Sequence, residues 1–139
     1  MVKRNLHLKT EVAVIGAGPG GYVSAIRLAD LGKEVTLVEK QARPGGTCLL
    51  EGCIPSKALI NAVELSESAK NAFKIGLEFS DLQVNMDKLR QWTDKIINDL
   101  SKGIEGLLKY RGIKVIQGHA RFLNNQSLKI DAHQTLQLN

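Results

Sequence analysis

The chain has 139 residues, about the size of one domain, and its 43% hydrophobic content is enough to build a core. Its formal net charge is +5, but the basic residues are scattered and only 4% of residues are aromatic, which argues against nucleic-acid partners. No stretch approaches the roughly 20 apolar residues of a membrane helix, and the basic start lacks the apolar run of a signal peptide, so we expect a cytoplasmic protein with no membrane contact.

The first predicted elements form a strand–turn–helix–strand unit. Residues 11–15 are a β-branched run, which predicts a strand buried on both faces, as in a parallel sheet. Residues 22–31 carry apolar side chains at helical spacing and end at Gly32, and residues 34–39 predict a second strand. This order favours an α/β fold with a Rossmann-like parallel sheet.

A glycine pattern follows the first strand and opens the helix. Gly16, Gly18 and Gly21 have the spacing G-x-G-x-x-G, and Glu39 closes the next strand about 20 residues on. In this context the pattern is typical of a dinucleotide site. Gly16 permits the tight turn, Gly18 lets the backbone approach a pyrophosphate, and Gly21 lets the helix pack closely. The helix N-terminus would hold the phosphates.

The Glu39 carboxylate can accept hydrogen bonds from ribose hydroxyls. It would repel a 2′-phosphate, so NADP is not expected at this site. The alternatives are a plain tight turn for the glycines and a solvated strand end for Glu39.

Both cysteines of the chain, Cys48 and Cys53, stand close together among glycines. Two such thiols can form a disulfide, bind a metal or stay inert. Residues five apart in a regular helix lie about 7.5 Å apart along the axis, whereas a disulfide needs Cα atoms within about 4.4–6.8 Å. The backbone must therefore be distorted, which Gly52 allows. We interpret the pair as a redox-active disulfide at the start of a helix that continues through Lys57.

A dinucleotide site followed by a cysteine pair indicates electron transfer between a bound cofactor, best a flavin, and a disulfide. Lys57 lies four residues after Cys53 and is expected to favour a thiolate or contact the flavin, unless it is a plain surface lysine. Zinc needs three or four ligands, and His7, His119 and His133 lie far from the cysteines in the sequence, so no metal is expected.

The rest of the chain predicts two long helices, at residues 55–71 and 86–111, which we expect to form a hairpin inserted in the fold and packed on the sheet. Trp92 is interpreted as a packing residue. Residues 76–85 predict a loop with a brief extended piece, and residues 113–117 a third strand of the parallel sheet. Three short strands then predict a small antiparallel β-meander, at residues 121–123, 127–131 and 135–138.

These motifs resemble those of the class I pyridine nucleotide-disulfide oxidoreductases, the flavin disulfide reductases. Three segments carry the resemblance, at residues 16–22, 39–40 and 45–57. Within the family, the chain is most similar to the members that oxidise dihydrolipoamide, on the segments at residues 22–32, 90–92 and 118–122. The resemblance extends from about residue 10 to the end.

The resemblance implies bound FAD, with its pyrophosphate at Gly16, Gly18 and Gly21 and its adenosine ribose on Glu39. It implies that Cys53 is the thiolate against the flavin and Cys48 the thiol that exchanges with substrate. The further cofactor contacts it implies are Lys40, Gly46, Thr47, Cys48, Lys57 and the backbone of Ala120.

The implied reaction is the oxidation of protein-bound dihydrolipoamide, with NAD⁺ as the final acceptor. The implied partners are the lipoyl domains of 2-oxo acid dehydrogenase complexes or of the glycine cleavage system. Family members are homodimers and continue for several hundred residues, through NAD and dimerisation domains. We therefore expect residues 1–139 to be the truncated N-terminal part of an FAD-binding domain, unable to turn over alone.

Two alternatives stay open: a relative that acts on glutathione, mercuric ion or another disulfide, and a non-catalytic FAD-binding module. The chain also departs from the family between the cysteines, where Leu50 and Glu51 replace the usual Asn-Val. We expect the carboxylate of Glu51 to raise thiol pKa values and to change the redox potential.

Overall fold

The computed structural model describes residues 6–78, 81–131 and 134–138. It divides the chain into two compact units. The first unit comprises Met1–Gly46 together with Ser101–Asn139, and the second comprises Thr47–Leu100. The two halves of the predicted site chemistry fall on either side of this division, with the glycine motif in the first unit and the cysteine pair in the second.

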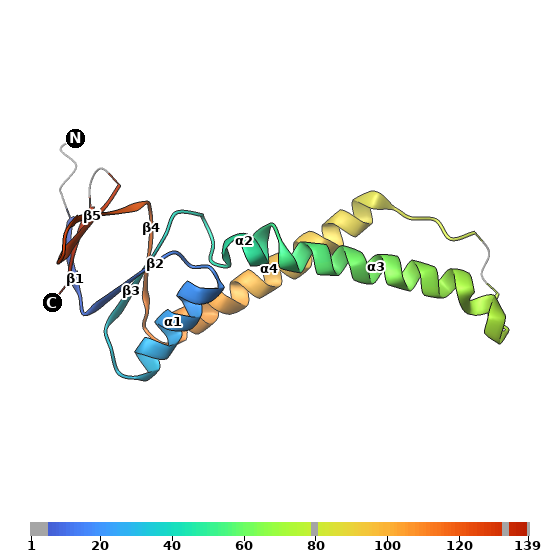
Figure 1. The fold of residues 1–139 in the computed structure, drawn as a ribbon, viewed down its shortest axis with the longest axis horizontal. Helices are drawn as coiled ribbons and strands as arrows, with labels where there is room; N and C mark the ends of the chain where they lie inside the picture. Colours follow the sequence, from blue (N-terminus) through green and yellow to red (C-terminus); the bar gives the residue numbers. More distant parts are fainter. Residues whose placement is uncertain (1–5, 79–80, 132–133, 139) are drawn as a thin grey trace. The chain divides into compact units, whose positions relative to one another are not determined.

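The first unit contains a three-stranded parallel sheet (Figure 1). Its strands are β2 (Val12–Ile15), β3 (Val35–Glu39) and β4 (Lys114–Gln117), in the order β2-β3-β4. The helix α1 (Pro19–Asp30) connects β2 to β3 and contacts both strands. The predicted strand–turn–helix–strand unit and the third parallel strand are therefore confirmed.

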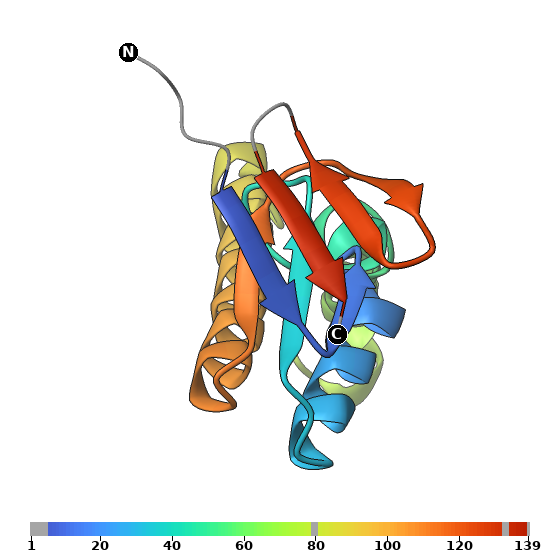
Figure 2. The ribbon, with the colours of Figure 1, turned by 90° about the vertical axis from the view of Figure 1, so that its left-hand side faces the viewer.

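A second, four-stranded sheet has the order β1-β7-β6-β5 (Figure 2). Strands β5 (Ala120–Asn124), β6 (Ser127–Ile130) and β7 (Gln134–Leu138) form the predicted antiparallel meander. Strand β1 (Leu6–Thr10), which pairs in parallel with β7, was not predicted from the sequence. The signal was present, because Leu-His-Leu-Lys-Thr alternates apolar and polar residues with the period of a half-buried strand.

The core of the first unit lies between the two sheets. Buried side chains of the parallel sheet, Val38 and Ile116, pack with side chains of the meander, Leu128, Ile130 and Leu136. All five residues of β3 are buried, as expected for a central strand of a parallel sheet. β3 lies between β2 and β4, and its last residue, Glu39, at which the predicted site begins, is buried.

The predicted burial of the first strand on both faces is wrong. The first three residues of β2 are half-buried, and Ile15 is 47% exposed. The reason is topological: among the described strands β2 pairs only with β3, so it lies at an edge of the sheet. A β-branched run predicts a strand well, but it does not tell a central strand from an edge strand.

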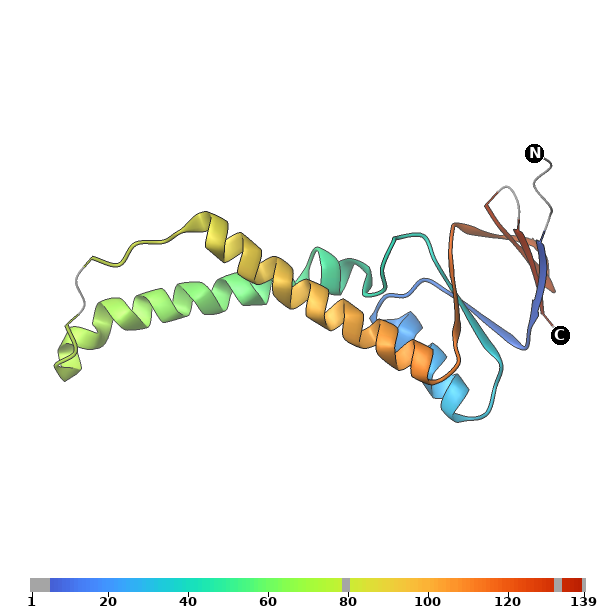
Figure 3. The same ribbon diagram turned by 180° about the vertical axis from the view of Figure 1, so that it is seen from behind.

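The second unit is helical (Figure 3). Helix α2 (Gly46–Leu50) leads into it, α3 (Cys53–Asn71) continues as the short 3₁₀ helix η1 (Ala72–Ile75), and the chain returns through α4 (Met86–Tyr110). The two predicted long helices are confirmed. The structure assigns no strand to the described part of residues 76–85, so the expected extended piece is not a strand.

Trp92 lies on α4 and lines a groove of about 380 Å³ together with side chains of α3 such as Leu65 and Ala69. This position fits the packing role predicted for it, although 42% of the residue is exposed. The packing of the helical hairpin on the sheet stays a prediction. None of the helices in the described part of the chain combines the length and apolar character that a membrane crossing requires.

Candidate functional site

The carboxyl ends of the three parallel strands meet at one edge of the sheet, where ligands of open α/β folds bind. The Gly16 N–H donates to the Val38 carbonyl over 2.7 Å, and the Gly118 N–H donates to the Glu39 carbonyl over 2.8 Å. The structure thus brings together the glycine loop, the end of β3 and the segment that leads to Ala120. Ala120 is half-buried at the start of β5 and packs against the core.

Backbone conformation and close backbone contacts require glycine at several positions of this edge. Gly16 has φ +92°, in the left-handed region that side chains disfavour. A Cβ on Gly21 would lie 1.8 Å from the Gly16 carbonyl oxygen, and a Cβ on Gly46 would lie 2.6 Å from the Gly18 Cα. The loop therefore packs backbone against backbone, which leaves no room for side chains at Gly21 and Gly46.

The N-terminus of α1 is open to an anion. Its cap residue Gly18 makes no side-chain capping bond, Pro19 follows, and the first turn carries no acidic residue. The first N–H groups of a helix have no partner within the helix, so they are free to bind phosphate oxygens. The chain therefore offers unopposed donors where the sequence predicted a pyrophosphate.

Glu39 is 7% exposed and holds the glycine loop in place. Its Oε2 accepts the Ala17 N–H over 2.5 Å, and its Oε1 accepts the Gln41 N–H over 2.8 Å. Each carboxylate oxygen has a second lone pair, so ribose hydroxyls can still donate to it. The sequence predicted the ribose contact but gave no signal for this structural role. The neighbouring Lys40, also predicted to contact the cofactor, is exposed.

Gln41 is a residue that the sequence analysis missed. Its Oε1 is buried and has no hydrogen-bond partner in the described part of the chain. An unpaired buried acceptor costs about 1–3 kcal/mol, which a donor from a ligand would recover. Adenosine carries such donors in its ribose hydroxyls and amino group. The orphaned Oε1, the open helix end and the crowded glycines thus fit an adenine dinucleotide at this edge.

In the second unit the cysteines stand on different helices. Cys48 lies on α2 and Cys53 is the first residue of α3, with the cap Gly52 between the two helices. A Cβ on Gly52 would lie 3.1 Å from the Thr47 carbonyl oxygen, so the turn is tight. The predicted distortion of the helix between the cysteines is confirmed, and α3 continues through Lys57 as expected.

Both cysteines are free thiols in this structure; Cys48 is half-buried and Cys53 is exposed. A hydrogen bond with Cys53 raises the pKa of the Cys48 thiol, and burial raises it further, while the charge of Lys57 lowers it to a smaller extent. The charge of Lys57 acts toward the thiolate, but the pKa of Cys48 is raised overall, so the predicted role of Lys57 stays a prediction. The rise in pKa comes first from Cys53, and Glu51, which we expected to cause it, is exposed. The redox disulfide stays a prediction.

The predicted site residues divide between the units. The first unit holds Gly16, Gly18, Gly21, Glu39, Lys40, Gly46 and Ala120, and the second holds Thr47, Cys48, Cys53 and Lys57. Among the described residues, no three His, Cys, Asp or Glu side chains are grouped so that they could hold a metal ion.

The chain is similar to known proteins over most of its length. The chain is 45% identical to the dihydrolipoyl dehydrogenase of Bacillus subtilis strain 168, over 94% of its own length and 27% of the relative. It is 47% identical to that of Haloferax volcanii and 42% identical to that of Geobacillus stearothermophilus, with the same coverage. The chain thus spans about a quarter of the length of these relatives. The family model described as pyridine nucleotide-disulphide oxidoreductase matches residues 10–138, and the chain belongs to this family.

Proposed function

We propose that the chain binds FAD and carries the redox disulfide of a flavin-dependent dihydrolipoyl dehydrogenase. The observation that carries the proposal is the tie between Glu39 and the glycine loop at the carboxyl edge of the sheet. Gly46 packs against Gly18 of this loop, and Cys48 follows Gly46 by two residues in the chain. The similarity to dihydrolipoyl dehydrogenases extends over both features.

The dinucleotide would lie with its pyrophosphate on the N-terminus of α1, at Gly16, Gly18 and Gly21. Its adenosine ribose would bond to Glu39 and to the Oε1 of Gln41, which has no hydrogen-bond partner in the described part of the chain. Further contacts are proposed for Lys40, Gly46, Thr47, Cys48, Lys57 and the backbone of Ala120. When bound, FAD supplies a two-electron carrier between the disulfide and NAD⁺.

The two cysteines have different roles in this proposal. A substrate thiolate attacks the sulfur of Cys48 in the oxidised chain, forms a mixed disulfide and releases Cys53 as a thiolate. The second substrate thiol then attacks the mixed disulfide and releases Cys48, so the substrate loses two electrons and the chain gains them. Cys53, at the N-terminus of α3, is the thiolate proposed to face the flavin.

The substrate class is protein-bound dihydrolipoamide, and the partners are the lipoyl domains of 2-oxo acid dehydrogenase complexes or of the glycine cleavage system. We place the protein in the cytoplasm. The chain spans about a quarter of the length of the relatives it matches, so we propose the NAD⁺ site, the homodimer and the complete reaction for the longer protein.

The test is the visible absorption spectrum of the purified chain after incubation with FAD and gel filtration. We expect the chain to carry flavin, and a dithiol reductant without oxygen to produce a long-wavelength shoulder from the thiolate–flavin contact. Cys53→Ser should abolish the shoulder and retain the flavin, whereas Ser66→Ala, a change of one side-chain heteroatom elsewhere on α3, should change neither. A chain that stays colourless would overturn the proposal.

A further inference from the structure

The outer face of the four-stranded sheet carries two basic side chains that form no salt bridge in the described part of the chain. Arg121 on β5 and Lys129 on β6 are directly opposite each other in the register, and both side chains are exposed. Like charges directly opposite each other on neighbouring strands destabilise a sheet. Neither residue forms a salt bridge within the described part of the chain. The pair therefore costs stability unless an anion is bound.

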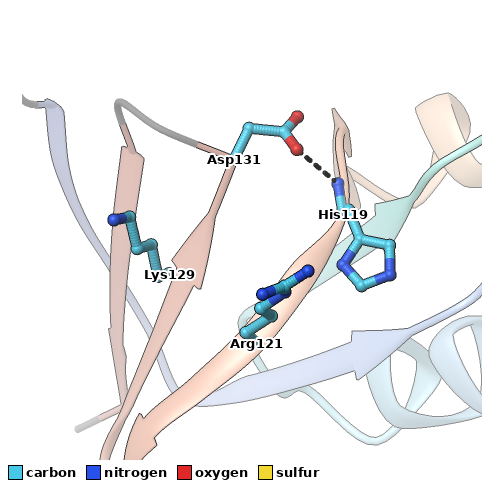
Figure 4. Close-up of a pocket in the computed structure, with 4 residues that line it drawn as sticks. All are labelled: His119, Arg121, Lys129 and Asp131. Carbon is cyan, nitrogen blue, oxygen red and sulfur yellow. Dashed lines mark hydrogen bonds between the residues drawn. The ribbon is translucent and has the colours of Figure 1, made fainter.

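These two cations line a pocket of about 310 Å³ together with His119 and Asp131 (Figure 4). Asp131 places one carboxylate in the same pocket, but it forms no ion pair with Arg121 or Lys129 in the described part of the chain, so the pocket keeps a net positive charge. The Asp131 Oδ1 accepts the His119 N–H over 3.2 Å, and the Asp131 N–H donates to the His119 carbonyl over 3.1 Å. The carboxylate thus fixes the wall of the pocket instead of pairing with Arg121 or Lys129.

The backbone around this wall is specialised. Asp131 has φ +48°, a left-handed conformation that is uncommon for a residue with a side chain. A Cβ on Gly118 would lie 2.7 Å from the Asp131 Oδ2 and 2.6 Å from a methyl carbon of Ile130. Gly118 therefore makes room for the carboxylate, and the position of the acid depends on the absence of a side chain there.

The side chains show how an anion would be held. The Arg121 guanidinium extends toward the side of the pocket where His119 lies, and the Lys129 amino group points away from Arg121 (Figure 4). A guanidinium can bind two oxygens of a phosphate with parallel hydrogen bonds, and a flexible lysine adds a point charge.

We propose that this pocket binds a small phosphate-type dianion, either inorganic phosphate or the phosphate monoester of a nucleotide. The pocket volume is at the lower limit for small-molecule sites, which suits a group of this size. The site is separate from the helix end proposed for the FAD pyrophosphate. It would therefore stand even if the proposed FAD function failed.

The experiment is a titration of the 139-residue chain with inorganic phosphate, followed by backbone amide NMR at constant ionic strength. We expect saturable shifts at residues 119–121 and 129–131. Arg121→Gln should weaken phosphate binding about tenfold or more, and Lys129→Gln less, because the first removes a paired donor and the second a single charge. Lys9→Gln removes an exposed cation from β1 that does not line the pocket and should have no effect.

A second titration with 5′-AMP, compared with adenosine, separates the two sources of phosphate. Binding of 5′-AMP that is tighter than that of inorganic phosphate, with the same Arg121 dependence, identifies a nucleotide monoester, and binding no tighter than that of inorganic phosphate identifies inorganic phosphate. Adenosine that binds as tightly as 5′-AMP would overturn the proposal, because the phosphate would then contribute nothing. Because FAD is proposed to contact the backbone of Ala120, residues 129–131 are read in this comparison, and their phosphate shifts should persist in saturating FAD. The proposal is overturned if Arg121→Gln and Lys129→Gln bind phosphate like the unaltered chain, or if FAD abolishes the binding, because the phosphate would then occupy the glycine loop.

Discussion

The glycine loop and the cysteine turn are both glycine-rich bends beside a helix start, yet they are built differently. In the loop, the backbone is fixed by Glu39, which is buried and accepts N–H groups from both sides. In the turn, the functional groups are two thiols, one of them exposed, whose main influence on each other is a shared hydrogen bond. The backbone of the loop is thus held by a buried side chain of a neighbouring strand. The turn, in contrast, is characterised by the hydrogen bond between its own two thiols.

The difference follows from the chemistry proposed for each bend. A pyrophosphate is held by backbone N–H groups, which must be preorganised because they cannot adjust one at a time. A thiol must reach a substrate sulfur, so it has to be accessible and its protonation must be tunable. Substitutions in the loop should therefore change folding and cofactor binding together, and substitutions in the turn should change reactivity alone.

The largest effect is expected for Gly21→Val. The new side chain would start 1.8 Å from the Gly16 carbonyl oxygen, so the loop has to shift as a whole. We expect a loss of about 3 kcal/mol in the free energy of unfolding, measured by urea denaturation, and the loss of FAD binding. Gly21→Ala and Gly20→Ala form the matched pair, since the same Cβ meets the Gly16 carbonyl oxygen at 1.8 Å on Gly21 and nothing within 4 Å on Gly20. Equal losses for both variants would show that the loop is not crowded.

Glu39→Gln should have the second largest effect. The amide keeps one acceptor but turns an NH₂ group toward a backbone N–H of Ala17 or Gln41. A buried donor left unpaired costs about 1–3 kcal/mol, so both the free energy of unfolding and the affinity for FAD should fall. Glu34→Gln changes an exposed carboxylate just before the same strand and should leave both quantities unchanged. Normal stability with weakened FAD binding would mean that Glu39 serves the ribose alone.

The sequence predicted much of the loop and less of the turn, for physical reasons. Gly16, Gly21 and Glu39 could be found because a tight turn, a close helix and a strand end each leave a residue type at a fixed spacing. The tie from Glu39 to Ala17 and the orphaned Oε1 of Gln41 could not, since they depend on side-chain positions that no spacing encodes. The cysteine pair was visible, but the source of the Cys48 pKa shift required three-dimensional proximity.

The sequence also predicted the strands without predicting how they are arranged in the sheet. The β-branched runs identified β2, β3 and β4, but only the pairing order shows that β3 is central and β2 is at an edge. The pocket below Arg121 and Lys129 was also invisible, because the register that makes these residues face each other depends on the turn between β5 and β6.

Cys53→Ala tests the turn. Removing the thiol that bonds to Cys48 should lower the pKa of Cys48 toward its ordinary value, so the midpoint of its alkylation by iodoacetamide should move to lower pH. Lys57→Gln should move the same midpoint to higher pH, because the ammonium charge favours the thiolate. Mass spectrometry of the Cys48 peptide measures both. The free energy of unfolding at neutral pH should change in neither variant, and a large change there would break the contrast with the loop.

The smallest effect is expected for Glu11→Gln. Like Glu39, Glu11 accepts a backbone N–H with its carboxylate, but it does so on the surface. The Glu11 carboxylate accepts the Glu34 N–H over 2.7 Å at the opposite end of β2, and this bond, followed by Lys33, lowers its pKa below 4.5. A folded-state pKa below the unfolded value stabilises the fold above about pH 4.5, and this contribution disappears as the pH falls through the folded pKa. Glu11→Gln should therefore flatten the fall in unfolding free energy between pH 5 and pH 3, by an amount far smaller than the loss for Glu39→Gln. Denaturation series at both pH values measure the difference. If Glu11→Gln and Glu39→Gln lose equal free energy of unfolding at pH 7, the burial of Glu39 does not increase its contribution to stability. The difference between the rigid loop and the accessible turn would then depend only on the close backbone packing at the glycines.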